Sequence, residues 1–175
     1  MPKNKVLSRR TVIAGAFVPV SAITAAVKAT LSPPERKILE AFVDRLVPHD
    51  EYGPSAGEAG VVDYIDRSLS DFLAPEKPAL LKGLAALDAL RFTAMSPAQQ
   101  DDVLTSIEKS ADLRPFFLRV RQLTMEGMFG DPFYGGNRGY AGWDLIRYPG
   151  PRLAVSPEEQ KAGVEIKPVR GSHGH

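Results

Sequence analysis

Residues 130–150 read GDPFYGGNRGYAGWDLIRYPG, and the rest of the chain leads into or away from this stretch. Glycine and proline recur throughout it, supplying positive φ angles and removing backbone donors, so we expect an ordered loop and no regular helix or strand. It is not a flexible linker, because it contains Phe133, Tyr134, Tyr140, Tyr148 and the only tryptophan, Trp143. Such aromatic side chains either fold back as a lid on a helical core or form an exposed partner-binding surface, and both roles can coexist.

Upstream of the loop, apolar residues recur at three- and four-residue spacing in five segments, which predicts amphipathic helices. Ser32-Pro33 and Ser96-Pro97 each combine a serine cap with a proline in the first turn, and Pro115 suits the first turn of the last helix. The expected buried positions, helix by helix, are Ile38, Leu39, Phe42, Val43 and Leu46; Val61, Val62, Ile65, Leu69 and Phe72; Leu80, Leu81, Leu84, Leu87 and Leu90; Val103, Leu104 and Ile107; and Phe116, Phe117, Val120, Leu123, Thr124 and Met128.

The expected fold is therefore all-α: a small bundle of roughly five helices with a long ordered glycine and aromatic loop. No segment alternates apolar and polar residues as a strand does. The last helix, with the broadest apolar stripe, is expected to be the central one. Asp63, Asp66 and Arg67 fall on the polar side of the second helix and are predicted to be solvated. Residues 152–175 lack a periodic face and are expected to form an extended or disordered tail.

The composition argues against chemistry on this chain. Without cysteine it cannot form disulfides, thiolate-ligated iron–sulfur clusters or the attachment site of c-type haem. The three histidines, His49, His173 and His175, lack the spacing of a metal site. No nucleophile motif or phosphate-binding loop occurs, and a net charge of +1 gives no footprint for nucleic acid. We expect no catalytic residue, cofactor or metal on the chain.

The first residues resemble an export signal. Arg9 and Arg10 precede a weakly hydrophobic, alanine-rich stretch, residues 14–27, that is too short to span a membrane. This pattern predicts a twin-arginine signal, and Arg9 and Arg10 are its predicted functional residues. Small residues allow cleavage after Ala29 or after Ala26. The expected organisation is a signal at residues 1–29, a helical domain at 30–151 and the tail at 152–175.

The loop also carries a family resemblance. Gly-Asp-Pro-x-Tyr-Gly-Gly-Asn at residues 130–137 and Gly-Trp-x-x-Ile-x-Tyr-Pro-Gly-Pro at residues 142–151 resemble the signature of the gluconate 2-dehydrogenase subunit 3 family. Its members are small accessory subunits of periplasmic flavin-dependent sugar and polyol dehydrogenases. The motif positions that match are Asp131, Pro132, Tyr134, Gly135, Gly136, Asn137, Gly142, Trp143, Pro149 and Gly150. All of these except Pro132 are predicted to bind the partner. Arg147 departs from the smaller residue expected before the tyrosine.

The resemblance implies specific roles within the loop. Its glycines would provide backbone geometry, and Asn137 would occupy a turn or left-handed position or bond to the loop backbone. Trp143 would be a buried anchor, either at an interface or in the packing of the loop, and not a catalytic group.

The resemblance further implies a non-catalytic subunit needed for assembly and twin-arginine co-export of a large FAD-dependent dehydrogenase. That flavoprotein would carry the FAD, and a multihaem cytochrome c would carry haem in a third subunit. The complex would be periplasmic and held at the inner membrane, with this chain touching the membrane only through the complex. An alternative from the residues is a stand-alone periplasmic helical binding protein for a small sugar.

Overall fold

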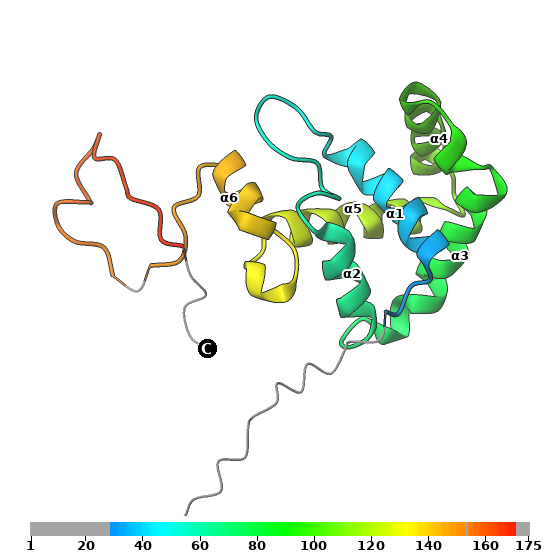
Figure 1. Cartoon of the computed structure of the whole chain (residues 1–175), viewed down its shortest axis with the longest axis horizontal. Coiled ribbons are helices and arrows are strands. Elements are labelled where there is room, and N and C mark those ends of the chain that lie inside the picture. Colours follow the sequence, from blue (N-terminus) through cyan, green and yellow to red (C-terminus); the bar gives the residue numbers. More distant parts are fainter. Residues whose placement is uncertain (1–28, 153, 171–175) are drawn as a thin grey trace, which may run out of the picture.

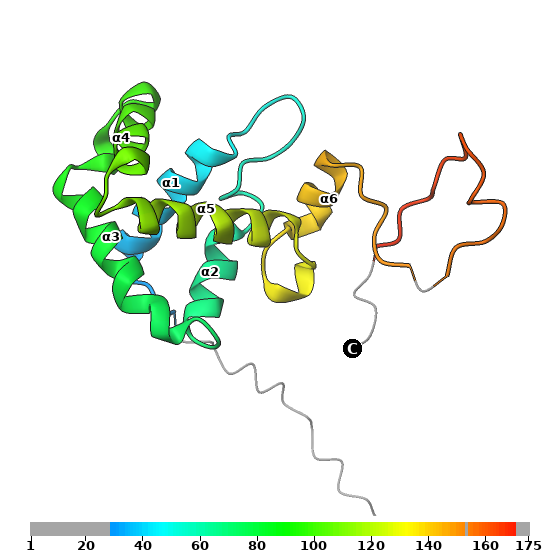
Figure 2. The same ribbon diagram turned by 180° about the vertical axis from the view of Figure 1, so that it is seen from behind.

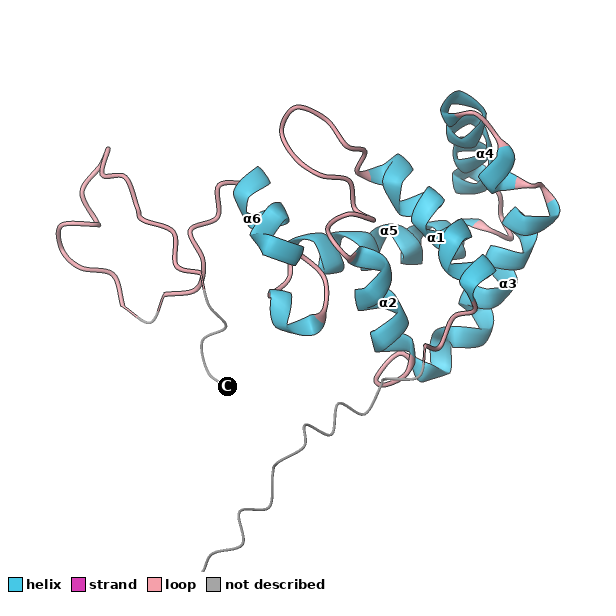
Figure 3. Ribbon diagram, viewed as in Figure 1, coloured by secondary structure: helices cyan, strands magenta, loops and turns pink. Residues whose placement is uncertain are grey.

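The computed structural model describes residues 29–152 and 154–170, and Figure 1 shows their arrangement. Arg9 and Arg10 lie outside the described residues. The described part is helical and includes no strand, which confirms the predicted all-α class (Figure 3). Its helices are α1 (Pro33–Leu46), α2 (Val61–Leu69), α3 (Lys77–Ala89), α4 (Pro97–Lys109), α5 (Arg114–Phe129) and α6 (Ala141–Leu145).

Helix α5 is the central helix of the bundle, as its broad apolar stripe predicted. It contacts α1, α2, α3, α4 and α6. Figures 1 and 2 show α4 and α6 at opposite ends of the helical part, with the segment after α6 forming a separate lobe beyond it. The six residues predicted to be buried on α5 are all buried. The chain therefore leaves the core at the end of α5 and enters the loop directly.

The helix starts follow the capping signals in the sequence. The backbone N–H of Ser96 donates to Gln99 Oε1 at 2.9 Å, and the Ser96 hydroxyl accepts from Gln99 N at 3.4 Å. This capping box satisfies backbone donors that the first turn of α4 leaves without partners. Pro97 occupies the first helical position, where the absence of an N–H costs nothing.

A cluster of aromatic rings joins α1 to α5 in the core. Phe42 is fully buried and meets Phe116 and Phe117 at centroid distances of 5.8 and 5.7 Å. Gly83 of α3 lies against the same cluster, because a Cβ placed there would come within 2.2 Å of the Phe116 ring. The glycine that interrupts the apolar spacing of α3 thus makes room for Phe116.

Three predictions about side-chain burial were wrong. Phe72 and Leu90 are 60% and 49% exposed, because α2 ends at Leu69 and α3 ends at Ala89, so the helical periodicity does not extend to them. Asp66 was expected to be solvated, yet it is only 8% exposed. Its carboxylate accepts hydrogen bonds from the segment before α1, which covers it.

The loop also differs from the expectation that it contains no regular helix. Residues Ala141–Leu145 form α6, and short 3-10 turns occupy Pro132–Tyr134 and Arg138–Tyr140. A five-residue helix is too short to be stable alone, so α6 depends on the surface beneath it. None of the described helices is long and apolar enough to cross a membrane.

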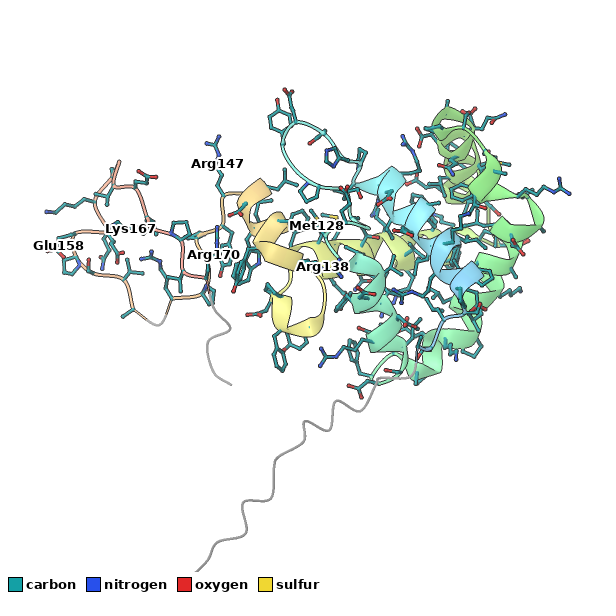
Figure 4. The ribbon with its side chains drawn as sticks, in the orientation of Figure 1. Met128, Arg138, Arg147, Glu158, Lys167 and Arg170 are labelled. Atoms are coloured by element: carbon teal, nitrogen blue, oxygen red, sulfur yellow. The ribbon has the colours of Figure 1, made fainter. Side chains whose placement is uncertain are left out.

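The segment after α6 has no helix or strand among its described residues and turns back on the loop. Val169 N donates to Pro149 O at 2.6 Å, and the Arg170 guanidinium pairs with Asp144 of α6. Figure 4 shows Arg170 on the α6 side of the lobe, while Lys167 and Glu158 lie farther out. That this tail is disordered in the isolated protein stays a prediction.

Candidate partner interface

The loop is seated on the end of α5 through backbone contacts that only glycine permits. A Cβ on Gly136 would lie 2.1 Å from the carbonyl oxygen of Gly127, and one on Gly142 would lie 1.8 Å from that of Met128. Both distances are far below van der Waals contact. The geometry of the loop therefore rests on two close approaches between its own backbone and the last turns of α5.

Asn137 connects three parts of the loop from a fully buried position. Its Nδ2 donates to Gly130 O at 2.8 Å, and its Oδ1 accepts from Gly142 N at 2.8 Å. Its backbone is left-handed, with φ of 46°, a conformation that asparagine tolerates better than most residues. Both roles expected of Asn137 are thus present: it occupies a left-handed turn, and it bonds to the loop backbone.

Trp143 anchors α6 to the loop and is 3% exposed. Its indole N–H donates to Phe129 O at 2.9 Å, which satisfies a carbonyl at the end of α5. The rings of Tyr140 and Tyr148 flank the indole at centroid distances of 5.3 and 5.1 Å. Trp143 was expected either at an interface or in the packing of the loop, and the structure shows it packed within the loop.

Two arginines attach the loop to α2. Arg138 N donates to Ala59 O at 2.8 Å, just before α2, and its guanidinium pairs with Asp63 at 2.7 Å (Figure 4). From the other side, Arg67 Nη1 donates to Phe133 O at 3.0 Å. The loop is consequently fixed to α2 as well as to α5, and its exposed side chains stand on a rigid base.

The exposed side of the loop forms one wall of a groove of about 650 Å³, which we call the Tyr134 groove. Its lining includes three exposed side chains, Tyr134 at 53%, Phe72 at 60% and Met125 at 47%. Phe133, itself 43% exposed, meets the Tyr134 ring edge-on at 5.4 Å. The groove is lined by Tyr64, Phe72, Met125, Glu126, Gly127, Phe129, Gly130, Asp131, Tyr134 and Gly136.

A polar network lies at the floor of the Tyr134 groove. The Tyr64 hydroxyl donates to Glu126 Oε2 at 2.9 Å, and Gln122 Nε2 donates to Glu126 Oε1 at 2.7 Å. Burial, together with the bond to Glu126, raises the pKa of Tyr64 to about 12. Tyr64 therefore stays protonated at neutral pH and is a donor, with no capacity to act as a base.

The structure divides the predicted partner-binding residues into two groups. Gly136, Asn137, Gly142, Trp143 and Gly150 are buried and hold the loop in shape. Asp131, Tyr134, Gly135 and Pro149 are exposed or half-buried, and Asp131 and Tyr134 line the groove. Within this second group, Asp131 Oδ1 accepts from Phe133 N at 2.9 Å, and Gly135 has φ of 104°.

Sequence reasoning missed several residues of this surface. Phe72 was assigned to the core by helical spacing, although α2 ends at Leu69, and Met125 was not singled out. Arg67 and Arg138 were not recognised as loop anchors, since their partners Phe133 and Asp63 are 66 and 75 positions away. The only available signal for Arg138 was its place directly after the motif asparagine.

The described residues offer no evident place for a metal ion. Nowhere in residues 29–152 or 154–170 do three or more histidine or carboxylate side chains gather as a ligand set. Near the loop, the Glu126 carboxylate is already bonded to Tyr64 and Gln122. What the geometry offers is a shaped apolar surface on a rigid support, which suits binding.

Comparison with known families agrees with this arrangement. The family model for gluconate 2-dehydrogenase subunit 3 matches residues 33–150, from the first residue of α1 to the end of the loop. The chain belongs to the gluconate 2-dehydrogenase subunit 3 family. This membership points to an accessory subunit of a dehydrogenase that associates with other subunits of a gluconate dehydrogenase complex. No curated protein and no solved structure matches the chain.

Proposed function

We propose that this chain is the non-catalytic small subunit of a periplasmic FAD-dependent sugar or polyol dehydrogenase, and that it binds the flavoprotein and directs its export. The observation that carries the proposal is the family match, which spans α1 to Gly150 and so includes the entire loop. The Tyr134 groove supplies a suitable contact surface. Exposed aromatic and methionine side chains on a rigid base are typical of the centre of a protein interface.

The predicted export signal explains why the two proteins would travel together. A flavoprotein binds FAD as it folds, so it must be exported folded, and the twin-arginine route transports folded proteins. In this proposal Arg9 and Arg10 serve both subunits, and the flavoprotein needs no signal of its own. The membrane contact and the haem c of the complex belong to the other subunits.

The alternative, a stand-alone sugar-binding protein, receives less support from the structure. A pocket of about 550 Å³ between α3 and α5 is lined mainly by apolar side chains such as Leu80, Phe116 and Leu123. Of its charged residues, Glu76 and Arg119 bind each other at 2.5 Å. A sugar site requires several free amides or carboxylates around an aromatic platform, and the Tyr134 groove likewise offers few.

Replacement of Arg9 and Arg10 by lysine tests the export role. We expect this chain and the flavoprotein to remain in the cytoplasm, and dehydrogenase activity to disappear from the periplasm. The control replaces Lys3 and Lys5 by arginine, which conserves charge outside the twin-arginine pair. A flavoprotein that still reaches the periplasm in the Arg9 and Arg10 variant would refute co-export. Absorbance of the isolated subunit, expected to lack flavin and haem bands, tests where the cofactors reside.

A second experiment tests the contact surface. The pair Tyr134→Ser and Met125→Ser should weaken the complex with the flavoprotein at least about tenfold while the subunit's own Tm changes little, since interface anchors contribute upwards of about 2 kcal/mol. Tyr52→Ser is the matched control, because Tyr52 is 73% exposed on the α1–α2 connection, away from the groove. Equal binding by the double variant and the control would place the interface elsewhere.

A further inference from the structure

The segment before α1 is attached to α2 through a buried carboxylate. Asp66 Oδ1 accepts from Thr30 N at 2.8 Å and from Leu31 N at 2.6 Å, and its Oδ2 accepts from Arg36 Nη1 at 2.9 Å. The Leu31 side chain is 1% exposed, whereas Ala29 is exposed and Thr30 is half-buried. Among the described residues, which start at Ala29, contact with α2 therefore begins at Thr30.

The peptide bond between Ala29 and Thr30 coincides with one of the two cleavage positions that the sequence allows. Val27 and Ala29 are the small residues that precede it. Cleavage after Ala26 would leave Val27, Lys28 and Ala29 in front, and Thr30 N would stay an amide. Cleavage beyond Leu31 would remove both backbone donors from a buried carboxylate, at the cost of an unsatisfied acceptor.

We propose that a signal peptidase hydrolyses the Ala29–Thr30 bond and that the new α-ammonium group of Thr30 forms an ion pair with Asp66. The inference rests on the proposed export role. Water supplies the oxygen that converts the Ala29 carbonyl into a carboxylate. The C–N bond breaks, and Thr30 N takes up the two protons of that water, giving an ammonium group at neutral pH. The nitrogen is already within ion-pair distance of Asp66 Oδ1.

The surrounding charges favour a cation at this position. Arg36 is shared, because its Nη2 bonds to Asp63 while its Nη1 bonds to Asp66. Asp63 has a second partner in Arg138, whereas Asp66 has no other charged partner among the described residues. Glu35, whose Oε2 accepts from Ser32 N, adds one more negative charge nearby. A Thr30 ammonium would give Asp66 a cation of its own.

Processing would then strengthen the attachment of the N-terminal segment. A hydrogen bond between an ammonium and a carboxylate is shorter and stronger than one between an amide and a carboxylate. Asp66 is largely shielded from water, so screening reduces the attraction little. The mature chain would be held to α2 more firmly than any form in which residues still precede Thr30.

The first test uses the full chain exported in a bacterium with a twin-arginine pathway. We expect intact mass and N-terminal sequencing of the periplasmic protein to place Thr30 first. Ala29→Leu should abolish cleavage at this bond, while the matched Ala26→Leu variant should yield the same Thr30 terminus as the natural sequence. A first residue other than Thr30, or an uncleaved periplasmic chain, overturns the proposal, as does a chain retained uncleaved in the cytoplasm.

The second test measures the ion pair itself. Chains that begin at Thr30 and at Val27 are compared by thermal unfolding at pH 7, each with Asp66 and with Asp66→Asn. We expect the Thr30 chain to melt several degrees above the Val27 chain and the difference to vanish with Asp66→Asn. Equal Tm values for the two Asp66 chains would overturn the ion pair. Failure of flavoprotein co-export, measured separately, would refute the proposed function and leave these two results standing.

Discussion

Asn137 shows how much of the loop depends on one side chain. Its side-chain Nδ2 donates to Gly130 O, and its Oδ1 accepts from Gly142 N. An aspartate at this position would have no N–H to donate to Gly130 O. Few residues other than glycine and asparagine accept its left-handed backbone readily. Asparagine is therefore required at position 137 for two reasons: its backbone accepts the left-handed conformation, and its side chain both donates and accepts a hydrogen bond.

Trp143→Ala should destabilise the isolated subunit. The indole is 3% exposed and bonds to Phe129 O, so its removal leaves a cavity and an unsatisfied carbonyl, at a cost of about 3–5 kcal/mol in the free energy of unfolding. Thermal or denaturant unfolding measures the loss, with Tyr52→Ala as the exposed control. If the variant instead kept its Tm and lost only the flavoprotein, the indole would belong to the interface.

His49 should titrate above its usual pKa. Its hydrogen bond to Glu58, at 2.8 Å, raises the pKa of His49 above 6.5 and lowers that of Glu58 below 4.5. The stabilisation from protonated His49 is complete below pH 6.5 and is lost as the pH rises through the raised value. The contribution of Glu58 is present above pH 4.5 and is lost as the pH falls through its lowered value.

NMR titration of the His49 ring checks this pair. With Glu58→Gln, the His49 pKa should return toward 6.5, because Glu58 is the main cause of the shift. Asp50→Asn is the control, since Asp50 makes the smallest contribution, and it should move the pKa little. A His49 pKa that is the same with Glu58 and with glutamine would contradict the contact.

At the residue scale, the sequence predicted the motif residues better than the charged ones. Asn137 and Trp143 could be assigned structural roles because a left-handed asparagine and a buried indole leave local signs. Asp66 could not be distinguished from its neighbour Asp63, because its burial comes from Thr30 and Leu31, more than thirty positions away. Helical periodicity predicts which side of a single helix is apolar, but it does not predict which other segments of the chain cover its polar side.

At the scale of elements, α6 owes its position to the surface of α5. Gly142→Ala should displace it, because the new methyl would lie 1.8 Å from Met128 O and backbone cannot yield as a flexible side chain does. We expect a loss of about 3 kcal/mol in the free energy of unfolding, the upper end for overpacking. Gly53→Ala, where the nearest atom is 4.0 Å away, is the matched control and should be nearly neutral. Equal stability of both variants would contradict the close approach.

Helix α6 was not predicted from the sequence because it is too short. The five helices from α1 to α5 have nine or more residues each, enough for apolar spacing and caps to be recognised. Helix α6 has five residues, contains a glycine, and receives its N-terminal acceptor from Asn137. No periodic pattern fits in so short a segment. The predictions that Phe72 and Leu90 are buried at the ends of α2 and α3 were wrong for a related reason, because tertiary contacts determine where a helix ends.

At the scale of the whole molecule, Arg170 joins the C-terminal lobe to the body. Its guanidinium pairs with Asp144 and lies 5.2 Å from the centre of the Tyr140 ring. Arg170→Ala should release the lobe and speed tryptic cleavage after Lys161, followed by mass spectrometry, while the Tm stays close to that of the natural chain. Arg147→Ala, whose side chain points away from the body in Figure 4, is the control. Equal cleavage rates in both variants would mean that Arg170 does not hold the lobe.

The attachment of the loop to α2 has a consequence for the order of folding. Tyr134 reaches its place only after Arg67 and Arg138 have met partners 66 and 75 positions away, and such distant contacts form late because the intervening chain must first be closed. The Tyr134 groove therefore does not exist on a nascent or half-folded subunit. A partner that recognises this groove would therefore bind only those copies of the subunit that have completed folding.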